Sequence, residues 1–159
     1  MNESFQEEGM CTCGEIQYQV TESPMFVHCC HCTWCQRETG SAFAVNALIE
    51  DVHVQLTKGA IETIDTPSNS GMGQVISRCP SCKTAVWSNY GAAKTAVCFV
   101  RVGTLNNPEC CPPDIHIFTS TKQKWLQLDG SIPVMSDYYQ RSKCWSVESV
   151  ARYKRALSA

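Results

Sequence analysis

Apolar and polar residues alternate in short runs along most of this chain, and this pattern predicts a mainly β protein. Residues 14–20 alternate with a period of two, as a half-buried strand does. A turn at Lys58-Gly59 separates two further alternating runs. The other short apolar or alternating runs predict strands at residues 25–27, 43–49, 52–56, 61–64, 74–78, 84–88, 96–102 and 115–118.

Two segments have helical patterns. Residues 33–39 contain few strand formers and end at Gly40, which is typical of a helical turn closed by glycine. Residues 146–157 carry apolar side chains at helical spacing, and Ser146 suits the N-cap position. The segment 66–73 is the clearest loop. Since no repeat or linker divides the chain, we expect residues 1–159 to form a single domain.

Charge and composition narrow the range of partners. The chain is 43% hydrophobic and 18% charged, with a net charge of −2, which is typical of a globular domain rather than a disordered one. Without a long basic stretch, nucleic acid is not an expected partner. Three basic residues near the end, Arg152, Lys154 and Arg155, are interpreted as the solvated face of a terminal helix.

The chain has twelve cysteines, and the cellular compartment decides whether they stay reduced or form disulfides. Residues 1–8 are acidic and lack the apolar core of a signal peptide, and no apolar run is long enough to cross a bilayer. We therefore expect a cytoplasmic protein without a membrane partner, in which thiols stay reduced. A disulfide scaffold would require secretion, so metal thiolates explain the cysteines better.

Two cysteine doublets predict one closed metal site. They are Cys11-Thr12-Cys13 and Cys79-Pro80-Ser81-Cys82. Four thiolates can surround a zinc ion tetrahedrally at about 2.3 Å each, and each doublet can supply two of them. A thioredoxin-like redox pair is the alternative for the second doublet, but no βαβ pattern surrounds it. Zinc binding would then stabilise a domain whose short strands bury little apolar surface.

A third cysteine-rich motif predicts a second, open site. Cys30, Cys32 and Cys35 can converge on one ion, and three protein ligands with a free fourth position are typical of catalytic zinc. A thiol bound at such a position is deprotonated near neutral pH and remains nucleophilic. His31 would close the site as a fourth ligand. In an extended stretch, however, its side chain and that of Cys29 should point away from the other ligands.

The remaining cysteines are not assigned to a metal. Cys98 lies in an apolar strand and is interpreted as a small buried hydrophobe. Cys110 and Cys111 lie in a proline-rich loop, where they could be reactive or bind metal, although a neutral role fits better. The sequence predicts no role for Cys144.

Four motifs in order resemble the glutathione-dependent formaldehyde-activating enzyme family, which also includes centromere protein V. The resemblance covers about residues 9–142. The motifs are Gly9-Met10-Cys11-Thr12-Cys13-Gly14, Cys30-His31-Cys32-Thr33-Trp34-Cys35-Gln36-Arg37 with Gly40-Ser41-Ala42-Phe43, Arg78-Cys79-Pro80-Ser81-Cys82, and Gly103-Thr104-Leu105 with His116-Ile117-Phe118 and Trp125. One position departs from the pattern, because Lys83 stands where the family usually has glycine. Lysine must then tolerate a left-handed turn.

The resemblance implies a compact β fold of small antiparallel sheets and two zinc ions, one structural and one catalytic. The implied structural ligands are Cys11, Cys13, Cys79 and Cys82. The implied catalytic ligands are Cys30, Cys32 and Cys35. The implied activity is the reversible addition of glutathione to formaldehyde, giving S-hydroxymethylglutathione.

Two hypotheses for function follow. The first is a zinc-dependent carbon–sulfur lyase that uses a small-molecule thiol such as glutathione and a small aldehyde. Arg37 is the candidate for holding a glutathione carboxylate, because it follows the third ligand and can pair in a bidentate manner; a purely structural arginine is the alternative. The second hypothesis is a non-catalytic zinc module that binds a macromolecular partner, since fold does not fix function.

Overall fold

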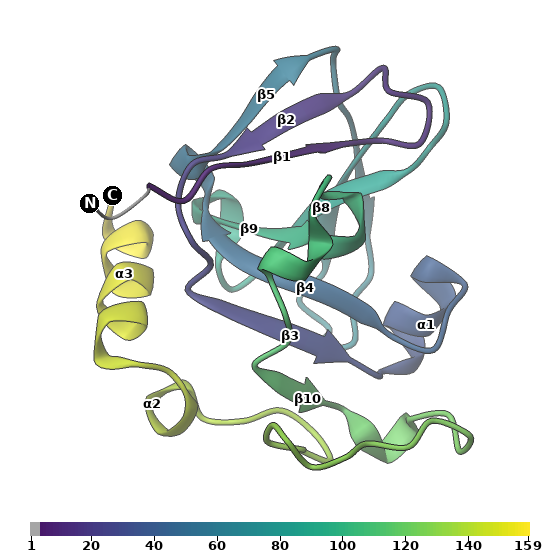
Figure 1. Ribbon diagram of the computed structural model, residues 1–159, viewed down its shortest axis with the longest axis vertical. Coiled ribbons are helices and arrows are strands. Elements are labelled where there is room, and N and C mark those ends of the chain that lie inside the picture. The colour runs from purple at the N-terminus through teal and green to yellow at the C-terminus, as the bar shows by residue number, and fades with distance from the viewer. Residues whose placement is uncertain (1–3) are drawn as a thin grey trace.

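The computed structural model describes residues 4–159, so the first three residues of the acidic opening segment lie outside it. The chain is mainly β, as the pattern of apolar residues predicts (Figure 1). The strands are β1 (Glu7–Met10), β2 (Gln17–Val20), β3 (Phe26–Cys30), β4 (Ala44–Glu50), β5 (Val54–Lys58), β6 (Glu62–Thr66), β7 (Gln74–Arg78), β8 (Ala85–Tyr90), β9 (Val97–Arg101) and β10 (Ile115–Ile117). The α-helices are α1 (Thr33–Thr39), α2 (Arg141–Cys144) and α3 (Val147–Ser158). Single 3₁₀ turns occupy Asp51–His53, Lys94–Ala96, Val102–Thr104, Pro108–Cys110 and Thr119–Thr121.

The strands form one small and one large sheet. The small sheet has the order β1-β2-β5, and the large sheet has the order β10-β3-β4-β9-β8-β7-β6. The large sheet is mixed, because β10 runs parallel to β3, with Ile115 opposite His28. The predicted antiparallel sheets are thus present, but seven strands join into one sheet. Local alternation cannot show this, because it reveals each strand and not the edge that the strand joins.

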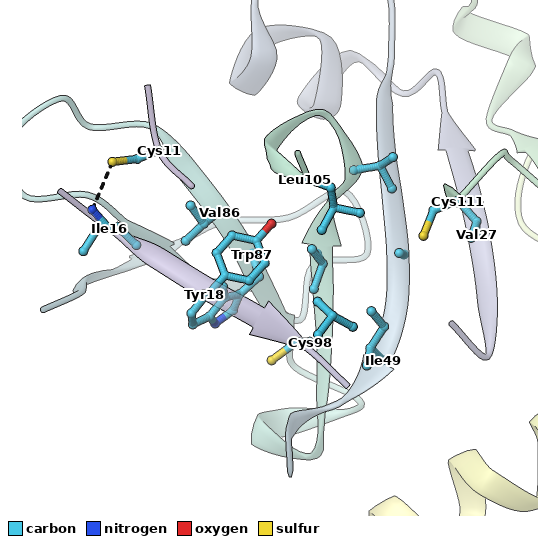
Figure 2. Packing of buried hydrophobic residues seen from close by; sticks show 14 of the residues in the cluster. Cys11, Ile16, Tyr18, Val27, Ile49, Val86, Trp87, Cys98, Leu105 and Cys111 are labelled. Carbon is cyan, nitrogen blue, oxygen red and sulfur yellow. Dashed lines mark hydrogen bonds between the residues drawn. The ribbon is translucent and has the colours of Figure 1, made fainter. Parts of the chain in front are cut away.

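Tyr18 of the small sheet packs against the large one. Its ring meets that of Trp87 edge to face (Figure 2), and the ring centroids lie 5.5 Å apart. The Tyr18 hydroxyl lies 2.6 Å from the Thr104 Oγ1 atom. Gly9 makes room for this ring, since a Cβ atom there would lie 2.4 Å from the Tyr18 Cζ atom. The main core therefore lies between the two sheets.

Helix α3 covers one end of the large sheet (Figure 1). Ser146 caps it by accepting a hydrogen bond from the Ser149 amide, as predicted. Tyr153 is buried against the sheet. The interpretation of Arg152 as a solvated residue is wrong, because its guanidinium pairs with both carboxylate oxygens of Glu50 at 2.8 and 2.7 Å. This pair fixes the helix to the end of β4.

Two elements were not expected from the sequence. Strand β1 contains two glutamates and a glycine, which are poor strand formers, and it is held by pairing along its whole length with β2. Helix α2 is a single turn that leads into α3. In residues 4–159 no helix combines the length and hydropathy that a membrane crossing requires.

Candidate metal centres and the adjoining pocket

Four thiols gather where two hairpin turns meet. Cys11 and Cys13 lie in the turn between β1 and β2, and Cys79 and Cys82 lie in the turn between β7 and β8. The Cys13 Sγ atom is 3.6 Å from the Cys11 Sγ atom and 3.7 Å from the Cys79 Sγ atom. Sulfurs bound tetrahedrally at about 2.3 Å from zinc would lie about 3.8 Å apart. The cluster therefore matches the dimensions of a four-thiolate zinc site.

Hydrogen bonds help this cluster to ionise. Thr84 hydrogen bonds lower the pKa of Cys82 to about 5. Burial raises the pKa of Cys11, but hydrogen bonds, led by the one from the Ile16 amide at 3.2 Å, outweigh burial and lower it overall (Figure 2). Cys13 keeps its proton, with a pKa raised to about 12; a hydrogen bond to the Glu15 backbone acts to lower this value, and interactions with the neighbouring thiols outweigh it. Two of the thiols are thus more readily ionised than ordinary cysteines, and it is the thiolate form that binds a metal cation.

Lys83 closes the second of these turns in the left-handed conformation. Its φ is 63°, and its amide donates to the Cys79 carbonyl at 3.0 Å. The Lys83 ammonium meets Glu62 at 2.8 Å. A lysine therefore occupies the strained turn that the sequence led us to expect, and the cluster of thiols forms around it.

Three further thiols gather where β3 leads into α1. Cys30 ends the strand, Cys32 is the N-cap of the helix, and Cys35 lies in its first turn. The Cys32 Sγ atom accepts a hydrogen bond from the Cys35 amide at 3.3 Å. All three sulfurs lie within 4.8 Å of one another, and all three side chains are buried. The structure thus brings together the three cysteines predicted to form the open site.

One member of this cluster is strongly acidic. Hydrogen bonds from Cys30 and Cys35 lower the pKa of Cys32 to about 3. A hydrogen bond from Cys30 acts to lower the pKa of Cys35, but Cys32 and burial outweigh it and raise the value to about 12. The cluster therefore holds one negative charge that its two neighbours share through hydrogen bonds. Such a set suits a divalent cation, which would displace the remaining protons.

His31 and Cys29 point away from this cluster and form a separate group with His116. The His31 Nε2 atom lies 2.9 Å from the His116 Nδ1 atom and 3.5 Å from the Cys29 Sγ atom. Two nitrogens bound tetrahedrally to zinc at about 2.05 Å would lie about 3.3 Å apart. The shorter spacing is that of a hydrogen bond between the two rings. The group therefore links the loop of the three thiols to β10.

A cavity of about 430 Å³ opens beside the three thiols. Its lining combines the three cysteines with aromatic rings from widely separated parts of the chain. The aromatic residues are His28, Trp34, Tyr90, Phe99, Phe118, Tyr138 and Tyr153. Burial, together with the nearby Arg141 cation, lowers the pKa of His28 to about 3, so this ring is neutral at physiological pH.

Two arginines reach the cavity, and neither was identified from the sequence. Arg101 is buried at the end of β9, where it donates hydrogen bonds to Asn46 and to the Ser88 hydroxyl. The Arg141 guanidinium lies 4.3 Å from the centre of the Tyr153 ring. In the part of the chain that the structure describes, neither arginine makes an ion pair with a carboxylate. Arg101 could have been identified from the sequence, because it is a charged residue at the end of the otherwise apolar run 97–101.

Arg37 lies elsewhere. It lines a separate hollow with Trp125 and Phe43, and it is absent from the lining of the cavity beside the three thiols. The structure therefore does not bring Arg37 together with the cysteines of the predicted open site.

The other cysteines lie outside the three groups. Cys98 is buried and donates to the Asp51 carboxylate at 3.3 Å. The Cys110 and Cys111 sulfurs lie 3.5 Å apart. Cys144 is half-buried at the end of α2.

Comparison with known proteins decides the family. The profile of the glutathione-dependent formaldehyde-activating enzyme family matches residues 6–121, well over half of the chain. The chain belongs to this family. The match contains all seven cysteines of the two thiol clusters, and zinc is compatible with both clusters. Membership also supports thiol and aldehyde chemistry related to glutathione and formaldehyde.

Two other comparisons add little about activity. No curated protein matches this family member. Among solved structures, a Rhodobacter sphaeroides protein matches with a TM-score of 0.46 and 14% identity, over 80% of this chain and 98% of that chain.

Proposed function

We propose that this protein is a zinc-dependent carbon–sulfur lyase that adds a small thiol such as glutathione to a small aldehyde, and that it works in the reducing cytosol. The observation that carries the proposal is the position of Cys30, Cys32 and Cys35 in the lining of a cavity. Family membership supports glutathione and formaldehyde as the substrate pair.

The two thiol clusters are proposed to have different tasks. The four-thiol cluster offers a complete tetrahedral ligand set and would hold a structural ion. The three-thiol cluster offers one ligand fewer beside a cavity and would hold the catalytic ion. A zinc ion there would supply a Lewis acid with one position free for an incoming thiol.

The chain's own residues bind and orient the reactants. Arg101 and Arg141 line the cavity and make no ion pair with a carboxylate of residues 4–159, and glutathione carries two carboxylates. Holding the thiol beside the aldehyde fixes their relative orientation and makes the bimolecular step effectively unimolecular. The thiol sulfur forms the new bond to the carbonyl carbon, and the thiol proton ends on the carbonyl oxygen. The role of Arg37 in holding a glutathione carboxylate stays a prediction. Arg37 lines a separate hollow, so it would contact only a part of the thiol substrate that extends outside the cavity.

The test measures adduct formation in excess of the spontaneous reaction. Purified protein with a determined zinc content is mixed with glutathione and formaldehyde, and exchange NMR gives the rate with and without protein. We expect a protein-dependent rate that Cys32→Ser removes and that Arg101→Met lowers through a raised KM for glutathione. A zinc-loaded, folded protein without any excess rate would refute the lyase and leave the non-catalytic zinc module.

A further inference from the structure

The cavity beside the three thiols is walled by a connected chain of aromatic rings. Tyr90 and Phe99 lie 4.6 Å apart between ring centres, and Phe99 lies 6.4 Å from His28. His28 lies 6.0 Å from Tyr138, which lies 6.1 Å from Phe118. These spacings fall in the range of mutually packed rings, about 4.5–7 Å. The wall is therefore a preformed apolar surface that comes from strands β3, β8 and β9 and from two later segments.

Formaldehyde is too small to cover this apolar surface. It has one carbon and one oxygen, so it fills roughly the space of two water molecules, or about 60 Å³. The cavity measures about 430 Å³, which is within the size range of sites for drug-sized ligands. A one-carbon aldehyde would leave most of the ring wall in contact with water.

Glutathione accounts for a different part of the cavity. It is a polar tripeptide with two carboxylates, and these match the cations of Arg101 and Arg141, which form no ion pair within the described residues 4–159. It has no aromatic or large aliphatic side chain to cover rings such as Phe99. The arginines and the rings therefore recognise chemically different groups.

We propose that the aldehyde substrate of this protein carries an aromatic ring, which packs against the wall formed by Tyr90, Phe99 and Tyr138. This inference rests on the lyase activity proposed above and specifies its carbonyl substrate. Cys30 and Cys32 line the same cavity as this wall, so a ring bound there keeps its aldehyde group in the space that the cysteines also border. The bond changes are those of the formaldehyde reaction: the thiol sulfur bonds to the aldehyde carbon, and the proton moves to the oxygen.

The first experiment compares benzaldehyde with formaldehyde. Exchange NMR with glutathione gives the catalysed rate and the spontaneous rate for each aldehyde, so the difference in intrinsic reactivity cancels in their ratio. We expect the catalysed-to-spontaneous ratio to be about 10- to 100-fold higher for benzaldehyde, which is the range that burial of one ring supports. An equal or lower ratio for benzaldehyde overturns the inference and leaves the lyase proposal intact. If neither aldehyde reacts faster with protein, the lyase proposal fails as well.

A matched pair of variants tests the ring wall. Phe99→Ala removes a central ring of the wall and should lower the benzaldehyde-to-formaldehyde selectivity about tenfold. Phe5→Ala removes a ring that packs on the main core away from the cavity, and its selectivity should equal that of the wild type. Unchanged selectivity in folded Phe99→Ala contradicts the inference.

A binding experiment is independent of catalysis. Saturation-transfer NMR detects contact between the protein and the ring protons of benzaldehyde, and it needs no thiol. We expect a signal with the wild type and with Phe5→Ala, and a signal at least fivefold weaker with Phe99→Ala. Absence of a signal with the wild type overturns the inference even if formaldehyde is turned over.

Discussion

Replacing Cys11 by serine should destabilise the whole fold. Cys11 is 1% exposed and shares its cluster with Cys13 of its own turn and with the two thiols of the distant turn between β7 and β8. Structural zinc contributes an apparent binding free energy of about 10–16 kcal/mol, so an equal share for each of four thiolates is about 2.5–4 kcal/mol. For a domain of this size, this loss corresponds to a decrease in Tm of about 5–16 °C.

The matched control is Cys98→Ser. Cys98 is equally buried, at 1% exposure, but lies outside the thiol clusters, and its replacement hydroxyl can still donate to Asp51. Burying the hydroxyl should cost about 1 kcal/mol. The two variants thus make the same chemical change in the same degree of burial, with and without a metal cluster.

Thermal unfolding and zinc analysis of both variants decide the question. We expect Cys11→Ser to contain one zinc ion fewer than the wild type and to unfold at a clearly lower temperature than Cys98→Ser. We also expect a chelator to lower the Tm of the wild type towards that of Cys11→Ser. Equal Tm values for the two variants, with wild-type zinc content in both, would refute a stabilising metal at the four-thiol cluster.

Three further predictions concern single contacts. Cys32→Ser should lose one zinc ion and all catalysis, with a Tm within a few degrees of the wild type; a collapse of the fold would contradict the separation of the two sites. Arg152→Met should lower the free energy of unfolding by about 2 kcal/mol at pH 7, because it removes a nearly buried bidentate ion pair. Burial raises the pKa of Glu50, but its hydrogen bonds with Arg152 outweigh burial and lower it overall. This stabilisation is therefore complete above the ordinary carboxyl pKa and is lost as the pH falls through the lowered pKa of Glu50 in the folded protein. The difference between wild type and variant in urea titrations should shrink as the pH is lowered through this range, and a constant difference would argue against the ion pair. Gly9→Ala should cost about 1–3 kcal/mol, since its Cβ atom would lie 2.4 Å from the Tyr18 ring, and an unchanged unfolding midpoint in urea would show that the ring can shift freely.

Local sequence patterns were sufficient for the features that depend on neighbouring residues. The left-handed Gly40 ends α1 at the predicted position, and the period of two over residues 14–20 contains β2, which begins only at Gln17. The short cysteine spacings identified the three-thiol cluster and each of the two doublets of the four-thiol cluster. Each of these features is set by the geometry of a few consecutive residues, so the sequence carries it directly.

Features that depend on distant pairing could not be predicted in the same way. The hydrogen bond between His31 and His116 joins residues 85 positions apart, and the parallel pairing of β10 with β3 brings them together. Arg101 reaches the cavity because β9 pairs with β4, whereas Arg37, close to the cysteines in sequence, lies on another side of its helix. Nearness along the chain was therefore a poor guide to which cation reaches the thiols.

The positions of the two thiol clusters along the chain determine the order in which they are completed during translation. A ribosome makes the chain from its first residue, so the set ending at Cys35 is complete long before Cys82 has been synthesised. Until then, Cys11 and Cys13 form only half of their tetrahedron. The three-thiol cluster is thus the first complete set of sulfurs to emerge, and the four-thiol cluster can form only after Cys82 has been synthesised.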